Sequence, residues 1–193
     1  MIKYDNNILK GCFIAVGEPG SGKTAFITKL AVDNLKDRNY RLFSNYTYFN
    51  INYTRITLGN QKEKANGAID ILEKLDEDKN FFNNSIMCLD EIHIYLDAYD
   101  YFKKNNRRMQ TFFSQLRKRN ILLLATSQNI MNVDIRVRRQ TRNFFEMEQI
   151  TNNIFEVTTY KMMDGYYYPN VVSKYRVDLS NYFQYYDTNE IIE

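Results

Sequence analysis

Residues 17–24 read Gly17-Glu18-Pro19-Gly20-Ser21-Gly22-Lys23-Thr24, and this stretch decides the fold of the chain. It fits the pattern GxxxxGK[ST], whose glycines let the backbone wrap around phosphates and direct its N–H groups at them. The apolar run 11–16 before it predicts a buried strand. Apolar residues at helical spacing after it predict a helix over about 23–36. The eight residues therefore predict a P-loop that binds a nucleotide such as ATP at the positive end of a helix.

Two side chains of this loop have distinct predicted roles. Lys23 is expected to reach the β- and γ-phosphates, and the hydroxyl of Thr24 is expected to hold Mg²⁺. We expect Lys23 to be an exposed loop charge, so that its replacement would leave the fold intact. A chance glycine loop is the alternative, and the flanking strand and helix patterns argue against it.

A pair of carboxylates completes this predicted site. The apolar run 86–89 predicts a buried strand that ends at Asp90, where an aspartate can orient Mg²⁺. Glu91 follows directly, and a carboxylate beside the metal aspartate can polarise water for attack on the γ-phosphate. A solvated acidic pair at a strand end is the alternative.

The rest of the chain alternates strand and helix patterns. The expected elements are strands over 40–44, 121–126 and 143–147, and helices over 68–75 and up to about Asn120. This alternation predicts an α/β fold with a parallel central sheet and helices on both faces. Asp164-Gly165 is a hairpin turn signal, so an antiparallel hairpin is expected from strands over 154–161 and 166–177.

These elements predict one domain over residues 1–193. Its core is expected at about 11–150, with the hairpin and a tail over 151–193. The stretch 45–64 and the tyrosine-rich tail match no motif that we can assign. Cys12 and Cys88 lie in apolar runs and are expected to be reduced core residues. No apolar run approaches the length of a membrane span, so we expect a cytosolic protein.

Two further residues are expected near a γ-phosphate. In a parallel sheet of this topology the strand 121–126 lies between the P-loop strand and the Asp90 strand. Gln128, just beyond it, would then sense the phosphate or hold water, with a simple loop amide as the alternative. Arg117 closes the helix before that strand. There it could complement the helix dipole or act as an arginine finger on a neighbouring subunit's nucleotide.

The net charge of +3 conceals an uneven distribution. Residues 103–142 carry eleven basic side chains and one acid, a net charge of +10, whereas the rest of the chain carries −7. Such a segment suggests a polyanionic partner. Four of its residues follow a run of aromatics and suit a nucleic-acid backbone, with a solvated loop as the alternative: Lys103, Lys104, Arg107 and Arg108. A second cluster with the same ambiguity comprises Arg136, Arg138, Arg139 and Arg142.

Together these motifs resemble the FtsK–HerA class of P-loop ATPases, which belong to the RecA/FtsK-like group with an additional strand and a catalytic glutamate. The likeness is greatest to genome-packaging ATPases of internal-membrane viruses and to Zot-type ATPases of filamentous phages. It spans about residues 11–147 and rests, besides the P-loop, on 89–93, 113–120, 125–128 and 133–136.

This resemblance implies properties that the residues alone do not. It assigns the trans-acting arginine to Arg117 and the sensor glutamine to Gln128. It implies a homo-oligomer, commonly a hexameric ring, that moves double-stranded DNA. It also implies packaging of a viral genome in the host cytoplasm or in association with the virion, with capsid or membrane proteins as partners. Zot proteins carry a membrane segment after the ATPase domain, and none is seen in this sequence, so we expect packaging.

Three alternatives stay open. The same ATPase could drive assembly or extrusion of filamentous virions. A phosphotransferase acting on a nucleoside or metabolite would need an acceptor pocket and a lid arginine in cis, and Glu91 fits it poorly, because there the substrate supplies the nucleophile. A nucleotide-switched binding protein with little turnover is the third, and Glu91 argues against it as well.

Overall fold

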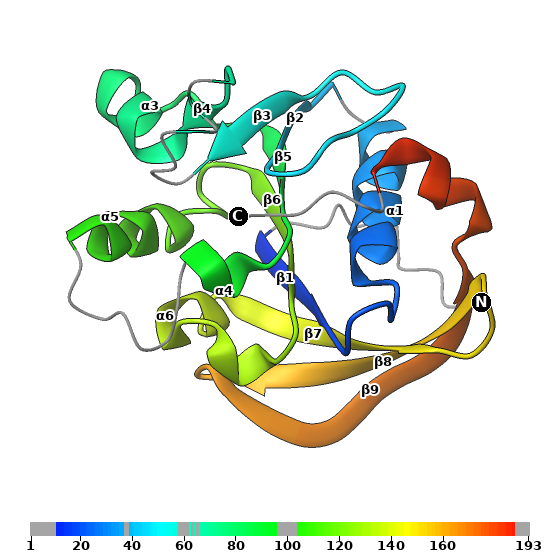
Figure 1. Cartoon of the computed structure of the whole chain (residues 1–193). Coiled ribbons are helices and arrows are strands. Elements are labelled where there is room, and N and C mark those ends of the chain that lie inside the picture. Colours follow the sequence, from blue (N-terminus) through cyan, green and yellow to red (C-terminus); the bar gives the residue numbers. More distant parts are fainter. Residues whose placement is uncertain are drawn as a thin grey trace.

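The structure is a computed structural model that describes residues 11–36, 39–57, 62, 64, 66–95 and 104–187, with only the backbone described at 104–106, 142 and 167–169. In this described part, nine strands form one sheet in the order β4-β3-β2-β5-β6-β1-β7-β8-β9 (Figure 1). The strands from β4 to β7 in this order are all parallel to their neighbours. β8 and β9 pair in antiparallel fashion. The predicted α/β fold with a parallel central sheet and a C-terminal hairpin is confirmed.

The strand order brings the predicted motifs to one edge of the sheet. β1 (Gly11–Val16) lies between β6 (Ile121–Ser127) and β7 (Thr141–Gln149), and β5 (Ser85–Leu89) lies on the other side of β6. At one edge Val16 pairs with Ser127 and Leu89 with Ala125. The carboxyl ends of β1, β5 and β6 therefore meet there, and the predicted position of the middle strand is confirmed.

Helices cover both faces of the sheet, as predicted. Successive side chains of a strand point to opposite faces, so Ile14 and Val16 pack in one core cluster and Ala15 in the other. α1 (Lys23–Lys36) covers one face together with the 3-10 helix η2 (Ser180–Tyr185), the red segment beside it in Figure 1. The other face is covered by α5 (Lys104–Phe113) and α3 (Ile71–Glu77), together with α4 (Ile92–Tyr95), η1 (Ile130–Asn132) and α6 (Ile135–Arg138).

The stretch that the sequence left unassigned holds a strand and two buried tyrosines. β2 (Arg41–Ser44) is followed by Tyr46 and Tyr48, whose hydroxyls lie 2.7 Å apart, and then by β3 (Thr54–Thr57). β4 (Ile69–Asp70) comes next and leads into α3 (Ile71–Glu77). α3 begins later than the predicted 68–75 helix because the Asp70 carboxylate accepts hydrogen bonds from the first free N–H groups of the helix.

α5 (Lys104–Phe113) ends earlier than predicted. The sequence predicted a helix up to about Asn120, but turns occupy residues 114–120, where the Ser114 hydroxyl donates to the Thr111 carbonyl (2.7 Å). A hydroxyl bonded to the backbone competes with helix formation. The predicted apolar face is buried as expected. Arg117 therefore lies in a turn and not at the end of a helix, which weakens the helix-dipole interpretation.

The predicted hairpin extends the sheet beyond β7. β8 (Ile154–Met163) and β9 (Tyr166–Asp178) are joined at Asp164 and Gly165, whose φ angles of 52° and 80° suit this turn. Arg138, which is 6% exposed, donates to the carbonyls of Gly165 (2.7 Å) and Val133 (2.9 Å). One buried guanidinium thus ties the hairpin turn to α6.

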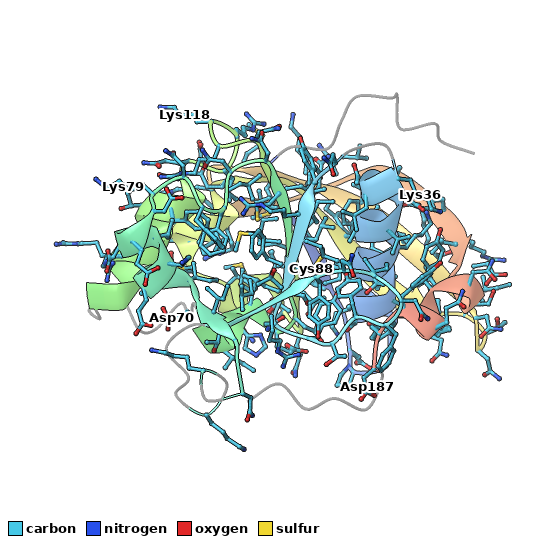
Figure 2. All side chains as sticks on the ribbon, turned by 90° about the horizontal axis from the view of Figure 1, so that it is seen from above. Lys36, Asp70, Lys79, Cys88, Lys118 and Asp187 are labelled. Carbon is cyan, nitrogen blue, oxygen red and sulfur yellow. The ribbon has the colours of Figure 1, made fainter. Side chains whose placement is uncertain are left out.

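Both cysteines lie in the core, one in each cluster, as expected. Burial raises the pKa of the Cys12 and Cys88 thiols to about 12. Figure 2 shows Cys88 in the interior, whereas Lys79 and Lys118 lie at the periphery. Among the described helices, none has the length and apolar character needed to cross a membrane.

Candidate active site

The P-loop packs so closely that two of its positions require glycine. Gly17 has a φ of 148°, and a Cβ there would lie 2.6 Å from the Met147 carbonyl oxygen of β7. Gly22 has a φ of 83°, and a Cβ there would lie 2.6 Å from the ring of Phe155 in β8. A side chain at either position would be strained and would displace β7 or β8. The C-terminal strands therefore support the loop from the side.

Lys23 is buried at 6% exposure, so the expectation of an exposed charge is wrong. Its Nζ donates to the carbonyls of Glu18 (2.8 Å) and Gly17 (3.0 Å) and so closes the loop on itself. Burial lowers the pKa of Lys23, and the nearby charges of Glu91 and Asp90 act in the opposite direction. Lys23 is buried because it is the first residue of α1 and the P-loop wraps around this first turn of the helix.

Thr24 and Asp90 lie together as a Mg²⁺ site requires. The Thr24 hydroxyl is 3.1 and 3.2 Å from the two carboxylate oxygens of Asp90, and the Thr126 hydroxyl also donates to Asp90. Burial raises the pKa of Asp90, and the two hydroxyls and Lys23 partly offset this. A carboxylate whose charge is penalised by burial fits a position beside a cation.

The types of side chain that surround this position also suit Mg²⁺ better than a metal held by protein side chains alone. The described residues contain no cluster of three or more histidine, cysteine or carboxylate side chains that could enclose a metal. Mg²⁺ in nucleotide sites is typically held by one or two carboxylates together with phosphates. Thr24 and Asp90 are therefore suited to Mg²⁺ bound with a nucleotide.

Two residues that the sequence did not mark hold the acidic pair in place. The Asn45 side chain, 2% exposed, donates to the Asp90 carbonyl (2.9 Å) and accepts from the Asp90 N–H (2.8 Å). The Thr126 hydroxyl accepts from the Glu91 N–H (2.9 Å). One signal was available for Asn45: it directly follows β2, the strand beside β5.

Glu91 adopts an unusual backbone conformation with a φ of 50°. Such left-handed conformations of residues other than glycine are uncommon and gather at functional sites. Burial and the charge of Asp90 raise the pKa of Glu91, whereas His93 and Lys23 lower it. His93 Nδ1 lies 3.2 Å from Glu91 Oε2, although not in hydrogen-bond geometry, since that oxygen is buried without a hydrogen-bond partner. This carboxylate can take up a proton more readily than an exposed glutamate.

Gln128 lies beside the P-loop, but it does not line the cavity that holds Lys23 and Glu91. It is exposed and, with Gly17 and Asn129, lines a cavity of about 370 Å³ beside the P-loop. The pairing of Val16 with Ser127 explains this position, because Gln128 follows β6 directly. The structure thus brings Gln128 next to the loop on the β6 side.

Arg117 lies at the opposite end of the sheet from the P-loop. It is exposed and packs beside Gly11, where an added Cβ would lie 3.5 Å from Arg117 Nε. Gly11 begins β1, so a six-residue strand, roughly 20 Å at 3.3 Å per residue, separates Arg117 from its own P-loop. The neighbouring Arg119 is bonded to Gln115 (2.9 Å) and to the Lys79 carbonyl. Of the two, Arg117 is the more exposed.

The basic segment is less available to a partner than its sequence indicates. Lys103 lies outside the described residues, and the side chain of Lys104 is not described. Arg107 is exposed, but Arg108 forms an ion pair with Asp76 of α3. In the second cluster several arginines also bind the protein itself: Arg136 pairs with the buried Asp134 (2.7 Å), Arg138 holds the hairpin turn, and Arg139 lies 3.4 Å from the Asp164 carbonyl.

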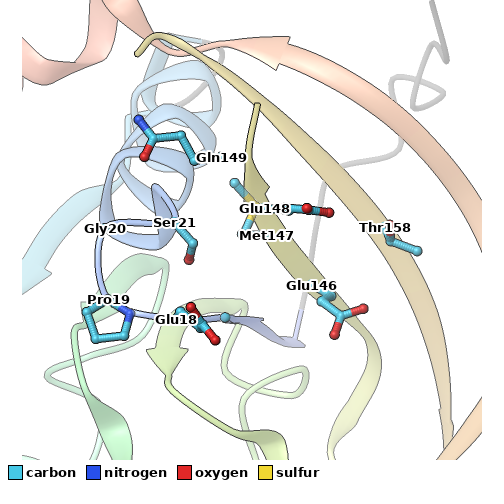
Figure 3. A pocket seen from close by; sticks show the side chains of 10 residues that line it. Glu18, Pro19, Gly20, Ser21, Glu146, Met147, Glu148, Gln149 and Thr158 are labelled. Atoms are coloured by element: carbon cyan, nitrogen blue, oxygen red, sulfur yellow. The ribbon is translucent and has the colours of Figure 1, made fainter. Parts of the chain in front are cut away.

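Two further cavities border the P-loop, and their charges differ. One, of about 580 Å³, is lined by Lys23, Thr24 and the two carboxylates that follow β5. The other, of about 480 Å³, lies on the β7 side, and Figure 3 shows the carboxylates of Glu18, Glu146 and Glu148 around it. Like charges repel, so a triphosphate favours the first cavity, where a lysine and a Mg²⁺ site balance the acids.

The loop between β1 and α1, the strand order and the acidic pair after β5 define a P-loop NTPase. The model of the ATPase family associated with various cellular activities (AAA) matches residues 13–151. The chain therefore belongs to this AAA family of ATPases. No curated protein sequence matches it.

Solved structures agree with this fold. The N-terminal domain of zonular occludens toxin from Neisseria meningitidis is similar with a TM-score of 0.64 and 16% identity, over 93% of this chain and 100% of that one. The genome packaging NTPase B204 from Sulfolobus turreted icosahedral virus 2, in complex with ATP-gammaS, is similar with a TM-score of 0.55 and 11% identity, over 82% of this chain and 95% of that one. The predicted resemblance to Zot and packaging ATPases is confirmed at the level of the fold.

Proposed function

We propose that this chain is a Mg²⁺-dependent ATPase that moves double-stranded DNA and packages a viral genome into a capsid. The observation that carries the ATPase part is the convergence of four groups at one edge of the sheet. Lys23, Thr24, Asp90 and Glu91 all line the same cavity. Membership of the AAA family supports the same activity.

Each residue has a task in this proposal. When ATP binds, the Lys23 ammonium group leaves the two loop carbonyls and donates to the β- and γ-phosphates instead. Thr24 and Asp90 hold the cation. Mg²⁺, when bound, neutralises charge on those phosphates. Glu91 accepts a proton from the attacking water, which its raised pKa favours. Gln128 positions the water or the γ-phosphate from the β6 side.

The DNA part rests on charge and on the similar viral protein. B204 is described as a genome packaging NTPase, and its fold is like that of this chain. The exposed side chain of Arg107, together with the neighbouring Lys103 and Lys104, would contact phosphates without reading sequence. We further propose a homo-oligomer, commonly a hexameric ring in the FtsK–HerA class, in which Arg117 serves the nucleotide of a neighbouring subunit. Host cytoplasm and capsid or membrane partners belong to the same proposal.

A hydrolysis assay with and without double-stranded DNA tests this function. We expect DNA of any sequence to stimulate the rate, and the stimulation to fall steeply between about 50 and 200 mM salt. Reversal of Lys103, Lys104 and Arg107 to glutamate should abolish stimulation and leave basal hydrolysis unchanged. Lys36→Glu, an exposed charge on α1, is the matched control. A hydrolysis rate that is the same with and without DNA would refute the proposed movement of DNA. The absence of any hydrolysis would refute the proposed ATPase activity.

A Zot-type role in assembly or extrusion of filamentous virions is the second candidate. It is favoured by the likeness to the N-terminal domain of zonular occludens toxin, which covers 93% of this chain, compared with 82% for B204. The same assay separates the two candidates, because DNA-stimulated hydrolysis supports packaging, whereas stimulation by a virion or membrane protein alone supports extrusion.

A further inference from the structure

We propose that the chain after β7 forms the subsite for the base and ribose of the nucleotide. This inference rests on the proposed ATP binding and deepens it. The cavity of about 580 Å³ lies within the range of small-molecule sites. It is lined by residues of the P-loop and by the acidic pair. The same cavity is also lined by Gln149, the last residue of β7, and by four residues of the chain after β7: Asn152, Phe155, Phe183 and Tyr186.

Contacts bring the tail directly to the P-loop. Phe155, 2% exposed, meets the Cβ position of Gly22 at 2.6 Å. The ring of Phe183 lies 6.3 Å from that of Phe155 and 6.4 Å from that of Tyr186, measured between centroids. Tyr186 lines the cavity together with Asp90. A row of three aromatic rings therefore borders the cavity.

The tail is held in this position by contacts outside the cavity. The Tyr182 hydroxyl donates to Asp33 of α1 (3.1 Å), and Lys29 lies 5.3 Å from the Tyr182 ring centroid. The Tyr185 carbonyl accepts from the Phe49 N–H (2.8 Å). Such anchoring means that little conformational freedom is lost when a ligand binds, which favours affinity.

The side chains that the end of β7 and the tail contribute to the cavity are suited to bind a nucleobase. Phe183 is half-buried, so part of its ring is open to stack on a flat aromatic base. Gln149 and Asn152 are exposed, and each amide offers a donor and an acceptor to the polar edge of a base. With the phosphates fixed at the P-loop, the remainder of the nucleotide has to lie along the cavity, towards these groups.

Four of these lining residues lie outside the part of the chain that the family model matches. The family model ends at residue 151, so Asn152, Phe155, Phe183 and Tyr186 lie beyond it. The alternative is that the aromatic row only packs the tail against α1. The two interpretations differ in what happens to a ligand that has phosphates but no base.

Calorimetric titration with Mg-ATP and with inorganic tripolyphosphate distinguishes a base subsite from a role in packing alone. Phe183→Leu keeps an apolar side chain of similar size but removes the ring. We expect ATP to bind roughly tenfold or more weakly, as for the loss of one aromatic stacking partner, and tripolyphosphate to bind as to the unchanged protein. Phe183→Tyr should restore ATP affinity. Tyr185→Ala, a change in the same tail but away from the cavity lining, should not alter the ratio of the two affinities.

Three outcomes would overturn the inference. The first is that the unchanged protein binds ATP no more tightly than tripolyphosphate, in which case the ATPase proposal survives. The second is that Phe183→Leu weakens both ligands equally, which assigns the row a packing role. The third is that neither ligand binds, which refutes the ATPase proposal as well. Thermal melting of each variant shows whether the fold is kept.

Discussion

Replacement of Asn45 by alanine would show how far the Mg²⁺ carboxylate depends on a residue outside the recognised motifs. The change removes the two hydrogen bonds, at 2.8 and 2.9 Å, that hold the Asp90 backbone. An unpaired buried polar group costs about 1–3 kcal/mol. Asp90 is half-buried, so water can satisfy part of the loss. We therefore expect the free energy of unfolding to fall by about 2–4 kcal/mol, and the Tm by roughly 5–15 °C.

The functional consequence is separate and can be measured on the folded protein. Partners that orient a metal ligand typically contribute about 10–100-fold to metal affinity or activity. Urea unfolding gives the stability change, and hydrolysis as a function of Mg²⁺ concentration gives the change in apparent affinity. Asn34→Ala is the matched control, because its side chain donates to the Leu30 carbonyl within α1 (2.7 Å), away from the acidic pair. Unchanged stability and an unchanged Mg²⁺ requirement in Asn45→Ala would refute the positioning role.

Four further predictions follow from the site and its supports. Lys23→Met should abolish ATP binding in a calorimetric titration. It should also lower the free energy of unfolding by about 1–2 kcal/mol, because the buried Lys23 donates hydrogen bonds to two carbonyls of the loop. Normal ATP binding would contradict the P-loop assignment. Glu91→Gln should bind ATP normally but hydrolyse it about 10²–10⁴-fold more slowly, and a retained rate would mean that another group activates the water. Arg117→Ala should be inactive alone and regain some activity when mixed with Glu91→Gln subunits, because an Arg117→Ala site keeps its own Glu91 and can use the intact arginine of a neighbouring Glu91→Gln subunit. No recovery at any protein concentration would exclude a trans arginine. Arg138→Met should lower the free energy of unfolding by about 2–4 kcal/mol, because two charged hydrogen bonds are lost. Arg139→Met, at the exposed neighbouring position, should change it by no more than about 0.5 kcal/mol. Equal effects of the two changes in urea unfolding would refute the role of Arg138 in holding the hairpin turn.

Features that rest on local patterns could be predicted from the sequence. The P-loop and α1 were found with their bounds because a glycine pattern and a helical period lie side by side in the chain. The order of β1, β6 and β5 followed from the topology that such motifs require, and Gln128 lies beside the loop because it follows β6 directly. The hairpin turn at Asp164-Gly165 followed from the φ preferences of those two residues.

Features that depend on partners distant in sequence could not be predicted in this way. Asn45 reads as the start of a polar stretch, and its role depends on Asp90, 45 residues further along. Arg108 and Arg138 read as free charges, but each has an acceptor in another element, Asp76 and the Gly165 carbonyl. Lys23 reads as an exposed loop residue, and its burial depends on how the loop folds back over it. Charge counted along a sequence therefore overstates the charge offered to a partner.

The position of β1 between β6 and β7 has a consequence for synthesis of the protein on the ribosome. β1 ends at Val16, but the first strand that pairs with it begins at Ile121 and the second at Thr141. At about 5–20 residues per second, translation needs roughly 5–20 s to reach the first of these strands. During that interval an apolar strand and the P-loop attached to it have emerged without a sheet to join. The nascent chain therefore carries an unpaired apolar strand, and the P-loop attached to it, until β6 has been synthesised.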